Sequence, residues 1–268
     1  KILKKYENTY KSQKSFNNHI GLPITLANQK RKSKFNIYEV GMNKLGEIHY
    51  LSNILKPNIG VITNIGEAHL GKLGSINNIA KAKSEIIENI VKNGVIILNR
   101  DCKYYRRLEK ISKEKKLKIL SFGHNSRATI SFKIINYQTI QIKFKKKLFN
   151  LELANIHSNY IRNILVCILI LDYLKLNINK VKKTFKSIKN IPGRGNLIKI
   201  NNSISVIDDS YNSNPTSLKN SIYDFHNFKT KKNKILVLGD MLELGKFSKN
   251  RHTEIGKYLK TFKFKRIY

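Results

Sequence analysis

Three side chains that could hold a metal ion beside a phosphate fall in the first third of the chain. Glu39 ends an apolar run in "YEVG", His69 belongs to "TNIGEAHL", and Lys83 lies in the helical pattern "SINNIAKAKSEIIENI". If both apolar runs are strands of a parallel sheet, Glu39 and His69 share the carboxyl-end edge, where α/β sheets bind ligands. A carboxylate and an imidazole at this edge could hold a hard divalent cation. Each residue alone is an ordinary surface group, but the set with Lys83 is more specific.

Lys83 is unusual because it falls inside the apolar stripe of its predicted helix. Ser75 is the expected N-cap, and the stripe consists of Ile76, Ile79, Ala80, Ile87 and Ile90. An unpaired ammonium is costly to bury, so Lys83 must reach solvent at the rim, pair with an acid, or be chemically altered. Reaching solvent is the commoner outcome for a lysine in this position.

Two adjacent acids in "VIDDSYNSNPTSLKNSI" mark a second candidate site. Asp208 and Asp209 end an apolar run, and the residues from Pro215 onward have the pattern of a helix start. A strand-to-helix corner of this kind binds ligands in open α/β sheets. The alternative is that the two acids cap the helix and solvate a loop.

Apolar runs alternate with helical patterns over most of the chain, which predicts an α/β fold with a mostly parallel central sheet and flanking helices. The expected strands are 35–40, 59–65, 95–98 and 119–122, and the expected helices are 46–55, 75–92 and 103–116. Alternation over 128–153 predicts a small antiparallel meander, followed by helices at 157–174 and 178–189. The break at "IPGRG" predicts a boundary between residues 1–191 and 192–268. The second part has the strand and helix pattern of part of a Rossmann-like domain.

Composition limits the class of protein. The 268 residues are 41% hydrophobic, and 52 basic against 17 acidic residues give a formal charge of +35. This charge is spread along the chain, which favours a drifted composition rich in Lys, Ile and Asn over specific nucleic-acid binding. Cys102 and Cys167 have no metal-binding spacing and indicate a reducing cytosol. The longest apolar run, 164–171, is far below the roughly 20 residues of a membrane span.

Seven motifs together resemble those of the Mur ligase family. In chain order they are "SFNNHIGLP", "YEVGMNKLGEI", "PNIGVITNIGEAHL", "IAKAKSEI", "PGRG", "DDSYNSNPTS" and "VLGDMLELG". Within the family, "YNSNP" and "GDMLELG" resemble the ligases that join D-alanyl-D-alanine to UDP-N-acetylmuramoyl-tripeptide. The resemblance implies a cytoplasmic, monomeric enzyme that uses ATP and Mg2+ in peptidoglycan precursor synthesis. It implies that the tripeptide carboxylate is phosphorylated to an acyl phosphate, which the dipeptide amine then attacks.

The resemblance also implies roles for individual residues. Glu39 matches a magnesium ligand, His69 a residue at the metal and phosphate site, and Lys83 the lysine that the family carbamylates, which would turn a misplaced cation into an acid. The residues matched to nucleotide contacts are Arg194, which reaches toward ATP, Asp209 at the ribose and Asn163 near adenine. The residues matched to substrate contacts are Asn17 and Asn18 at the UDP-sugar, and Asn212 and Asn214 at the cleft toward D-alanyl-D-alanine.

The sequence departs from the family pattern in two places. The family's Gly-rich phosphate loop would precede "SFNNHIGLP", but residues 1–15 contain none, so we expect a piece of a longer polypeptide that lacks ligase activity alone. Near adenine, "HSNYIRN" replaces the family's Gly-x-His-Asn-x-x-Asn and keeps only Asn163. These departures leave two alternatives: a decayed, non-catalytic remnant of such a ligase or, with less support, a basic nucleic-acid-binding protein.

Overall fold

A six-stranded sheet forms the centre of the structure. The computed structural model describes residues 1–13, 15–136, 138–153, 157–188, 192–228 and 230–268. The strands follow the order β3-β4-β5-β6-β7-β8, and their bounds are β3 Ile59–Ile62, β4 Val95–Asn99, β5 Lys118–Gly123, β6 Ile130–Ile134, β7 Thr139–Phe144 and β8 Lys147–Glu152. Strands β3 to β6 run parallel, while β7 and β8 complete an antiparallel meander. The predicted mostly parallel sheet with its meander is confirmed.

Helices cover both faces of this sheet. All five residues of β4 are buried, as expected for a central parallel strand. Side chains alternate between faces along a strand, so Ile96 and Leu98 pack into a core with α4 (Ile76–Ser84) and α5 (Tyr105–Glu114). Ile97 faces the other core, which α6 (Ser158–Tyr173) fills. The remaining helical segments around the sheet are α1 Gly21–Ala27, α2 Glu47–Leu55, α3 Leu70–Leu73, α7 Lys182–Ser187 and the 3-10 turns η1 Leu3–Lys5, η2 Glu85–Asn89 and η3 Ile178–Val181.

Four predicted elements differ from the structure, of which the expected strand 59–65 is the simplest case, since β3 ends at Ile62. The expected strand 35–40 is shorter, β2 (Phe35–Ile37), and it pairs only with β1 (Thr9–Lys11) in a separate two-stranded sheet. The expected helix 75–92 is α-helical only to Ser84 and continues as the 3-10 turn η2, because the Glu85 carboxylate turns away to accept hydrogen bonds from backbone N–H groups of the first turn of α2. The expected helix 178–189 divides into η3 and α7, and its last residue lies outside the described residues.

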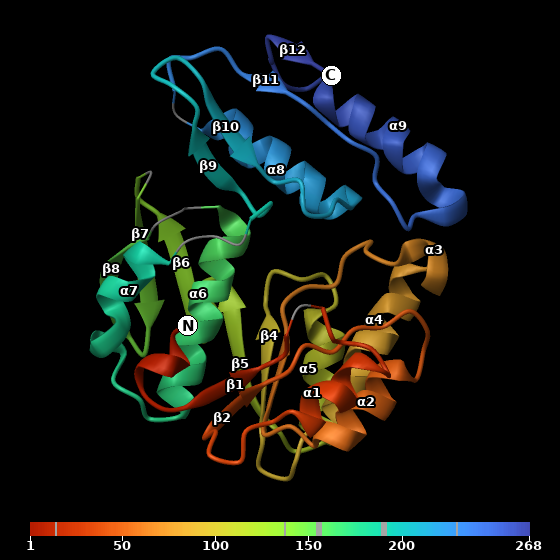
Figure 1. Ribbon diagram of the computed structural model, residues 1–268, viewed down its shortest axis with the longest axis vertical. Coiled ribbons are helices and arrows are strands. Elements are labelled where there is room, and N and C mark those ends of the chain that lie inside the picture. The colour runs from red at the N-terminus through yellow and green to blue at the C-terminus, as the bar shows by residue number, and fades with distance from the viewer. Residues whose placement is uncertain (14, 137, 154–156, 189–191, 229) are drawn as a thin grey trace.

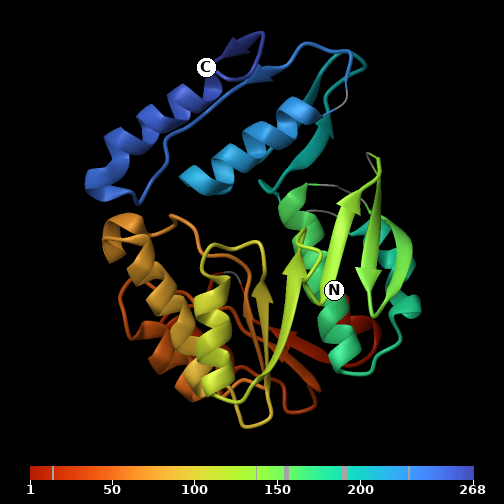
Figure 2. The same ribbon diagram turned by 180° about the vertical axis from the view of Figure 1, so that it is seen from behind.

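Residues 192–268, here called the C-terminal unit, form a smaller α/β layer above the carboxyl ends of the parallel strands (Figures 1 and 2). We call residues 1–188 the sheet unit. The elements of the C-terminal unit are β9 Asn196–Lys199, β10 Ser205–Asp208, α8 Pro215–Asn227, β11 Ile235–Leu236, the 3-10 turn η4 Gly245–Phe247, α9 Ser248–Leu259 and β12 Arg266–Ile267. β9 and β10 pair antiparallel, whereas β11 and β12 pair parallel. The predicted boundary after residue 191 borders residues 189–191, which lie outside the described residues.

The described helices include none that is both long enough and apolar enough to cross a lipid bilayer.

Candidate functional site

The candidate site lies where the C-terminal unit meets the carboxyl-end edge of the parallel sheet. The arrows of β4, β5 and β6 point toward this unit in Figure 1. The loop after β3, residues 63–69, and the start of α6 both contact the C-terminal unit through charged side chains. His69 lies in this loop, as predicted, at the edge where open α/β sheets bind ligands, and its role there stays a prediction.

Lys83 reaches this edge from the last turn of α4. Ser75 caps the helix by accepting a hydrogen bond from the Asn78 N–H at 3.1 Å, as predicted. The Lys83 side chain is mostly buried, and its Nζ donates to the Asn64 carbonyl oxygen in the loop after β3 at 2.8 Å. Burial lowers the pKa of Lys83, and the nearby Cys102 thiol partly opposes this change. Lys83 is therefore only partly exposed, and the hydrogen bond that the structure shows for its ammonium is to a neutral carbonyl.

Glu39 is exposed two residues after the end of β2, and its surroundings order its carboxylate. Its Oε1 accepts a hydrogen bond from Asn17 Nδ2 at 2.9 Å, and its backbone N–H donates to Ser12 Oγ. Gly41 permits this arrangement, because a Cβ there would lie 2.9 Å from the Asn17 side chain. Asn17 therefore positions Glu39 in this structure, in addition to any contact with a substrate.

Asn18 has a structural role at the start of α1. Its Oδ1 accepts hydrogen bonds from the N–H groups of Ile20 at 3.2 Å and Gly21 at 2.8 Å. These bonds satisfy donors that the first turn of a helix leaves free. The predicted substrate contact of Asn18 would therefore have to use its amide NH2 group.

His69 faces the C-terminal unit. It precedes α3 in a left-handed backbone conformation, with φ of 63°, which is uncommon for residues other than glycine. Its Nδ1 lies 2.8 Å from Glu243 Oε2, at an angle unsuited to a hydrogen bond, so the contact is an ion pair when the ring is protonated. The sequence did not predict this partner, although Glu243 belongs to the quoted motif "VLGDMLELG".

These contacts do not test the expected metal site, and one premise of it is wrong: Glu39 follows β2, which lies outside the sheet of β3, so Glu39 and His69 do not end strands of one sheet. Among the described residues, no group of three or more His, Cys, Asp or Glu side chains is placed to hold a metal ion. The Glu39 carboxylate suits Mg2+, which prefers oxygen ligands. Lys83 as an ammonium does not suit it, but a carbamate at Nζ would supply oxygen atoms. The set of Glu39, His69 and Lys83 therefore stays a prediction.

The loop 192–195, which carries Arg194, folds against the turn after β10, which carries Asp209. Gly193 has φ of 73°, and its N–H donates to Asp208 Oδ2 at 3.2 Å. The Arg194 guanidinium lies over the Tyr211 ring, 4.2 Å from its centroid, which is a cation–π contact. Asp208 orders this turn, while Asp209 is exposed and accepts a hydrogen bond from Ser221 Oγ. Each acid thus has a separate role, and Asp209 is the more accessible one.

The start of α6 contacts the C-terminal unit through Asp224 of α8. Asp224 Oδ2 lies 3.3 Å from His157 Nε2 and 3.4 Å from the Ser158 N–H. A carboxylate at this position stabilises the positive end of a helix. Asn163, matched to the adenine contact, lies exposed in the second turn of α6.

The two asparagines matched to the D-alanyl-D-alanine cleft differ in their surroundings. Asn214 is the N-cap of α8 and forms a capping box with Ser217, with both hydrogen bonds at 3.0 Å. Asn212 is exposed, and its Oδ1 accepts from the next backbone N–H at 2.8 Å. Asn212 therefore has more freedom than Asn214 to contact a substrate.

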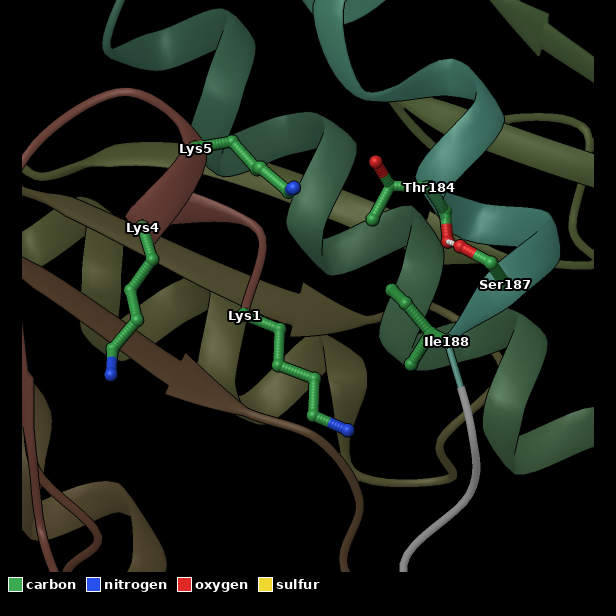
Figure 3. Close-up of a pocket in the computed structure, with 6 residues that line it drawn as sticks. All are labelled: Lys1, Lys4, Lys5, Thr184, Ser187 and Ile188. Atoms are coloured by element: carbon green, nitrogen blue, oxygen red, sulfur yellow. Dashed lines mark hydrogen bonds between the residues drawn. The ribbon is translucent and has the colours of Figure 1, made fainter.

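A pocket of about 550 Å3 lies apart from these residues, between η1 and α7 (Figure 3). It is lined by Lys1, Lys4, Lys5, Thr184, Ser187 and Ile188. The Lys4 side chain points away from Thr184 and Ser187, so the three lysines do not converge. The pocket contains none of the predicted site residues, and we assign it no function.

Comparison with known proteins agrees with the motifs and the fold. Residues 1–171 match the Mur ligase middle domain, and residues 193–268 match the Mur ligase glutamate ligase domain. The UDP-N-acetylmuramoyl-tripeptide–D-alanyl-D-alanine ligase of Rickettsia prowazekii is 36% identical over 93% of this chain and 56% of its own length. The enzyme of that name from Bacillus subtilis is 30% identical over 97% of this chain and 56% of its own length. The chain thus spans little more than half the length of these relatives.

Solved structures of ligases in this family also match the fold of this chain. The structure of MurF from Acinetobacter baumannii has a TM-score of 0.90 and 27% identity, and the match covers 99% of this chain and 58% of that one. The structure of MurF ligase from Thermotoga maritima in complex with ADP has a TM-score of 0.87 and 25% identity, with 97% and 60% covered. The fold, the seven motifs and both domain matches lead to one conclusion: this chain belongs to the Mur ligase family.

Proposed function

We propose that this chain is the ATP-handling core of a ligase that joins D-alanyl-D-alanine to UDP-N-acetylmuramoyl-tripeptide in peptidoglycan precursor synthesis. The names of its relatives support this choice of substrates, and an ADP complex of a structural relative supports the choice of nucleotide. In this proposal ATP phosphorylates the tripeptide carboxylate. The dipeptide amine then attacks the acyl phosphate, and inorganic phosphate leaves as the amide forms. We expect a monomeric enzyme that acts in the cytoplasm.

The observation that carries this proposal is the contact between the two units at one edge of the sheet. The loop after β3, which includes His69, meets Glu243, while Asn64 of the same loop accepts the Lys83 hydrogen bond. Arg194 and Asp209 lie on the C-terminal unit, whose α8 contacts the start of α6, the helix that carries Asn163. Phosphoryl transfer depends mainly on positioning and on neutralising charge, and such a junction can supply both.

Within this proposal, Glu39 and a carbamylated Lys83 are the groups that would hold Mg2+, with His69 beside them. The lowered pKa of Lys83 supports carbamylation, because only the neutral amine reacts with CO2, releasing a proton as the carbamate forms. When bound, Mg2+ supplies positive charge to the phosphate oxygens. Arg194, Asp209 and Asn163 contact the nucleotide. The UDP-linked tripeptide would be contacted near Asn17 and Asn18, and D-alanyl-D-alanine near Asn212 and Asn214. Asn18 and Asn214 would act mainly by holding the starts of α1 and α8 in place.

The test is ADP release by the native gene product that carries these residues, given ATP and UDP-N-acetylmuramoyl-tripeptide, with and without D-alanyl-D-alanine. We expect release that depends on the dipeptide, and none from residues 1–268 alone. The Lys83→Met variant should lower release by at least about 100-fold, since removing one electrostatic contributor typically costs this much. The matched control is Lys81→Met, which removes an exposed lysine from the same helix. Absence of release from folded native protein would favour the non-catalytic remnant.

A further inference from the structure

An ion pair between Glu67 and Arg251 joins the two units next to His69. Glu67 lies in the loop after β3 and Arg251 lies on α9, and Arg251 Nη2 is 2.8 Å from Glu67 Oε1. The Glu67 side chain is only 12% exposed and that of Arg251 is 25% exposed. We call these two residues the bridging pair. Its burial distinguishes it from the exposed ion pairs that contribute little to stability.

The bridging pair is buried by the contact between the two units, and some of its polar atoms have no other partner. Glu67 Oε2 and Arg251 Nε are buried and have no hydrogen-bond partner among the described residues. Arg251 also contacts Glu254 at 2.6 Å, three residues along the same helix. Glu254 therefore orients Arg251 within the C-terminal unit, and Glu67 is the acid of the sheet unit that Arg251 binds. Removing Arg251 would leave the largely buried Glu67 carboxylate without this cation, and removing Glu67 would leave Arg251 with Glu254 but without a partner on the sheet unit.

Two backbone features next to the bridging pair show how closely the units meet. The Gly71 N–H donates to the Glu243 carbonyl oxygen at 2.8 Å. A Cβ on Gly71 would lie 2.7 Å from the Gly245 nitrogen, so the two backbones are in direct contact. The same stretch of chain places Glu243 Oε2 against His69 Nδ1. Both units are rich in Lys and Arg and repel each other, so specific acid contacts are needed at this junction.

We propose that Glu67 and Arg251 are positioning residues, whose ion pair holds the C-terminal unit on residues 67–71 and thereby holds Glu243 against His69. The pair does not touch the reacting atoms; it fixes the approach of one unit to the other. Its importance for catalysis rests on the proposed function, whereas its effect on the junction does not. Separation of the units would break the Gly71 hydrogen bond and remove the His69 contact together.

Hydrogen exchange of the Gly71 amide in the 268-residue chain tests this proposal, because that amide bonds across the junction. The variants are Glu67→Arg, Arg251→Glu and the double variant with both changes, which restores opposite charges. We expect each single variant to speed Gly71 exchange by about tenfold or more, and the double variant to return to within about threefold of the starting chain. The matched control, Lys249→Glu, reverses an exposed charge on the same helix and should leave Gly71 exchange unchanged.

Exchange in the buried strand β4 shows whether each variant is folded. If a charge reversal also exposes β4, the milder Glu67→Gln replaces it, and the same increase at Gly71 is expected. Unchanged Gly71 exchange in the single variants, or no recovery in the double variant, would overturn the proposal. These outcomes are independent of ligase activity, so a remnant without catalysis could still retain the bridging pair.

Discussion

At the scale of single residues, Lys83 shows what a largely buried ammonium costs the fold. Its ammonium has lost most of its hydration, and among the described residues the hydrogen bond seen for it is to the carbonyl of Asn64. A hydrogen bond to a carbonyl does not replace an opposite charge, so the neutral form is favoured, as the lowered pKa records. A methionine of similar length would fit the apolar stripe without this cost.

We therefore predict that Lys83→Met raises the free energy of unfolding at pH 7 by about 1 kcal/mol, the order of a partly compensated burial cost. The folded pKa lies below the unfolded value of 10.5. Between these two values the unfolded state binds more protons, so the starting chain gains stability as the pH rises. The advantage of the variant should shrink as the pH approaches 10.5. Urea unfolding of both proteins at pH 7 and pH 10, in CO2-free buffer, measures this difference, and an equal advantage at both values would contradict it.

Residue types and motifs predicted positions better than they predicted contacts. Ser75 was recognisable as a cap because the hydroxyl precedes a helical pattern. Asn18 and Asn214 were matched to substrates, yet their oxygens cap helices in the structure. A capping signal at Asn214 was visible in "SNPTS", since Pro215 follows it directly. The partner of His69 could not be predicted, because Glu243 is distant in sequence and belongs to the other unit.

At the scale of elements, the strands inside the central sheet were predictable, but the pairing of the strand at 35–40 was not. Continuous apolar runs identified β3, β4 and β5, because strands buried on both faces need apolar side chains throughout. The run at 35–40 is interrupted by Asn36 and Glu39, and the strand within it, β2, has no fully buried residue and pairs with β1 instead. The 3-10 end of α4 depends on Glu85 binding α2, which is also a tertiary effect.

The contact of α3 with η4 gives a prediction at this scale. Gly71→Ala adds a methyl group that would lie 2.7 Å and 2.8 Å from backbone atoms of Gly245 and Glu243. Backbone cannot move aside as a flexible side chain can, so we expect a loss of about 1–3 kcal/mol of stability. Gly256→Ala is the matched control, because its Cβ meets open space within α9 and should stabilise the helix by up to about 1 kcal/mol. Urea unfolding followed by circular dichroism compares the two, and equal midpoints would contradict the close contact.

At the scale of the whole molecule, the net charge of +35 destabilises the folded state through repulsion between like charges. The chain has 17 acidic and 52 basic residues. Three of the acids, Glu67, Asp224 and Glu243, form ion pairs at the junction of the two units. Composition predicted the excess charge but not this distribution. In the sequence, Arg251 has the pattern of an ordinary charged residue on an amphipathic helix. Its pairing with Glu67 of the sheet unit could therefore not be predicted.

The same charge predicts how the chain behaves toward nucleic acids. Basic residues spread over the surface attract phosphates without reading bases, so we expect weak binding to duplex DNA that is indifferent to sequence. Affinity should fall by about 100-fold or more between 50 and 200 mM NaCl, because binding of this kind releases counterions. Fluorescence anisotropy with two unrelated duplexes at both salt concentrations measures this. A clear preference for one duplex that persists at 200 mM NaCl would instead support a specific nucleic-acid-binding protein, because specific base contacts survive salt better than phosphate contacts do.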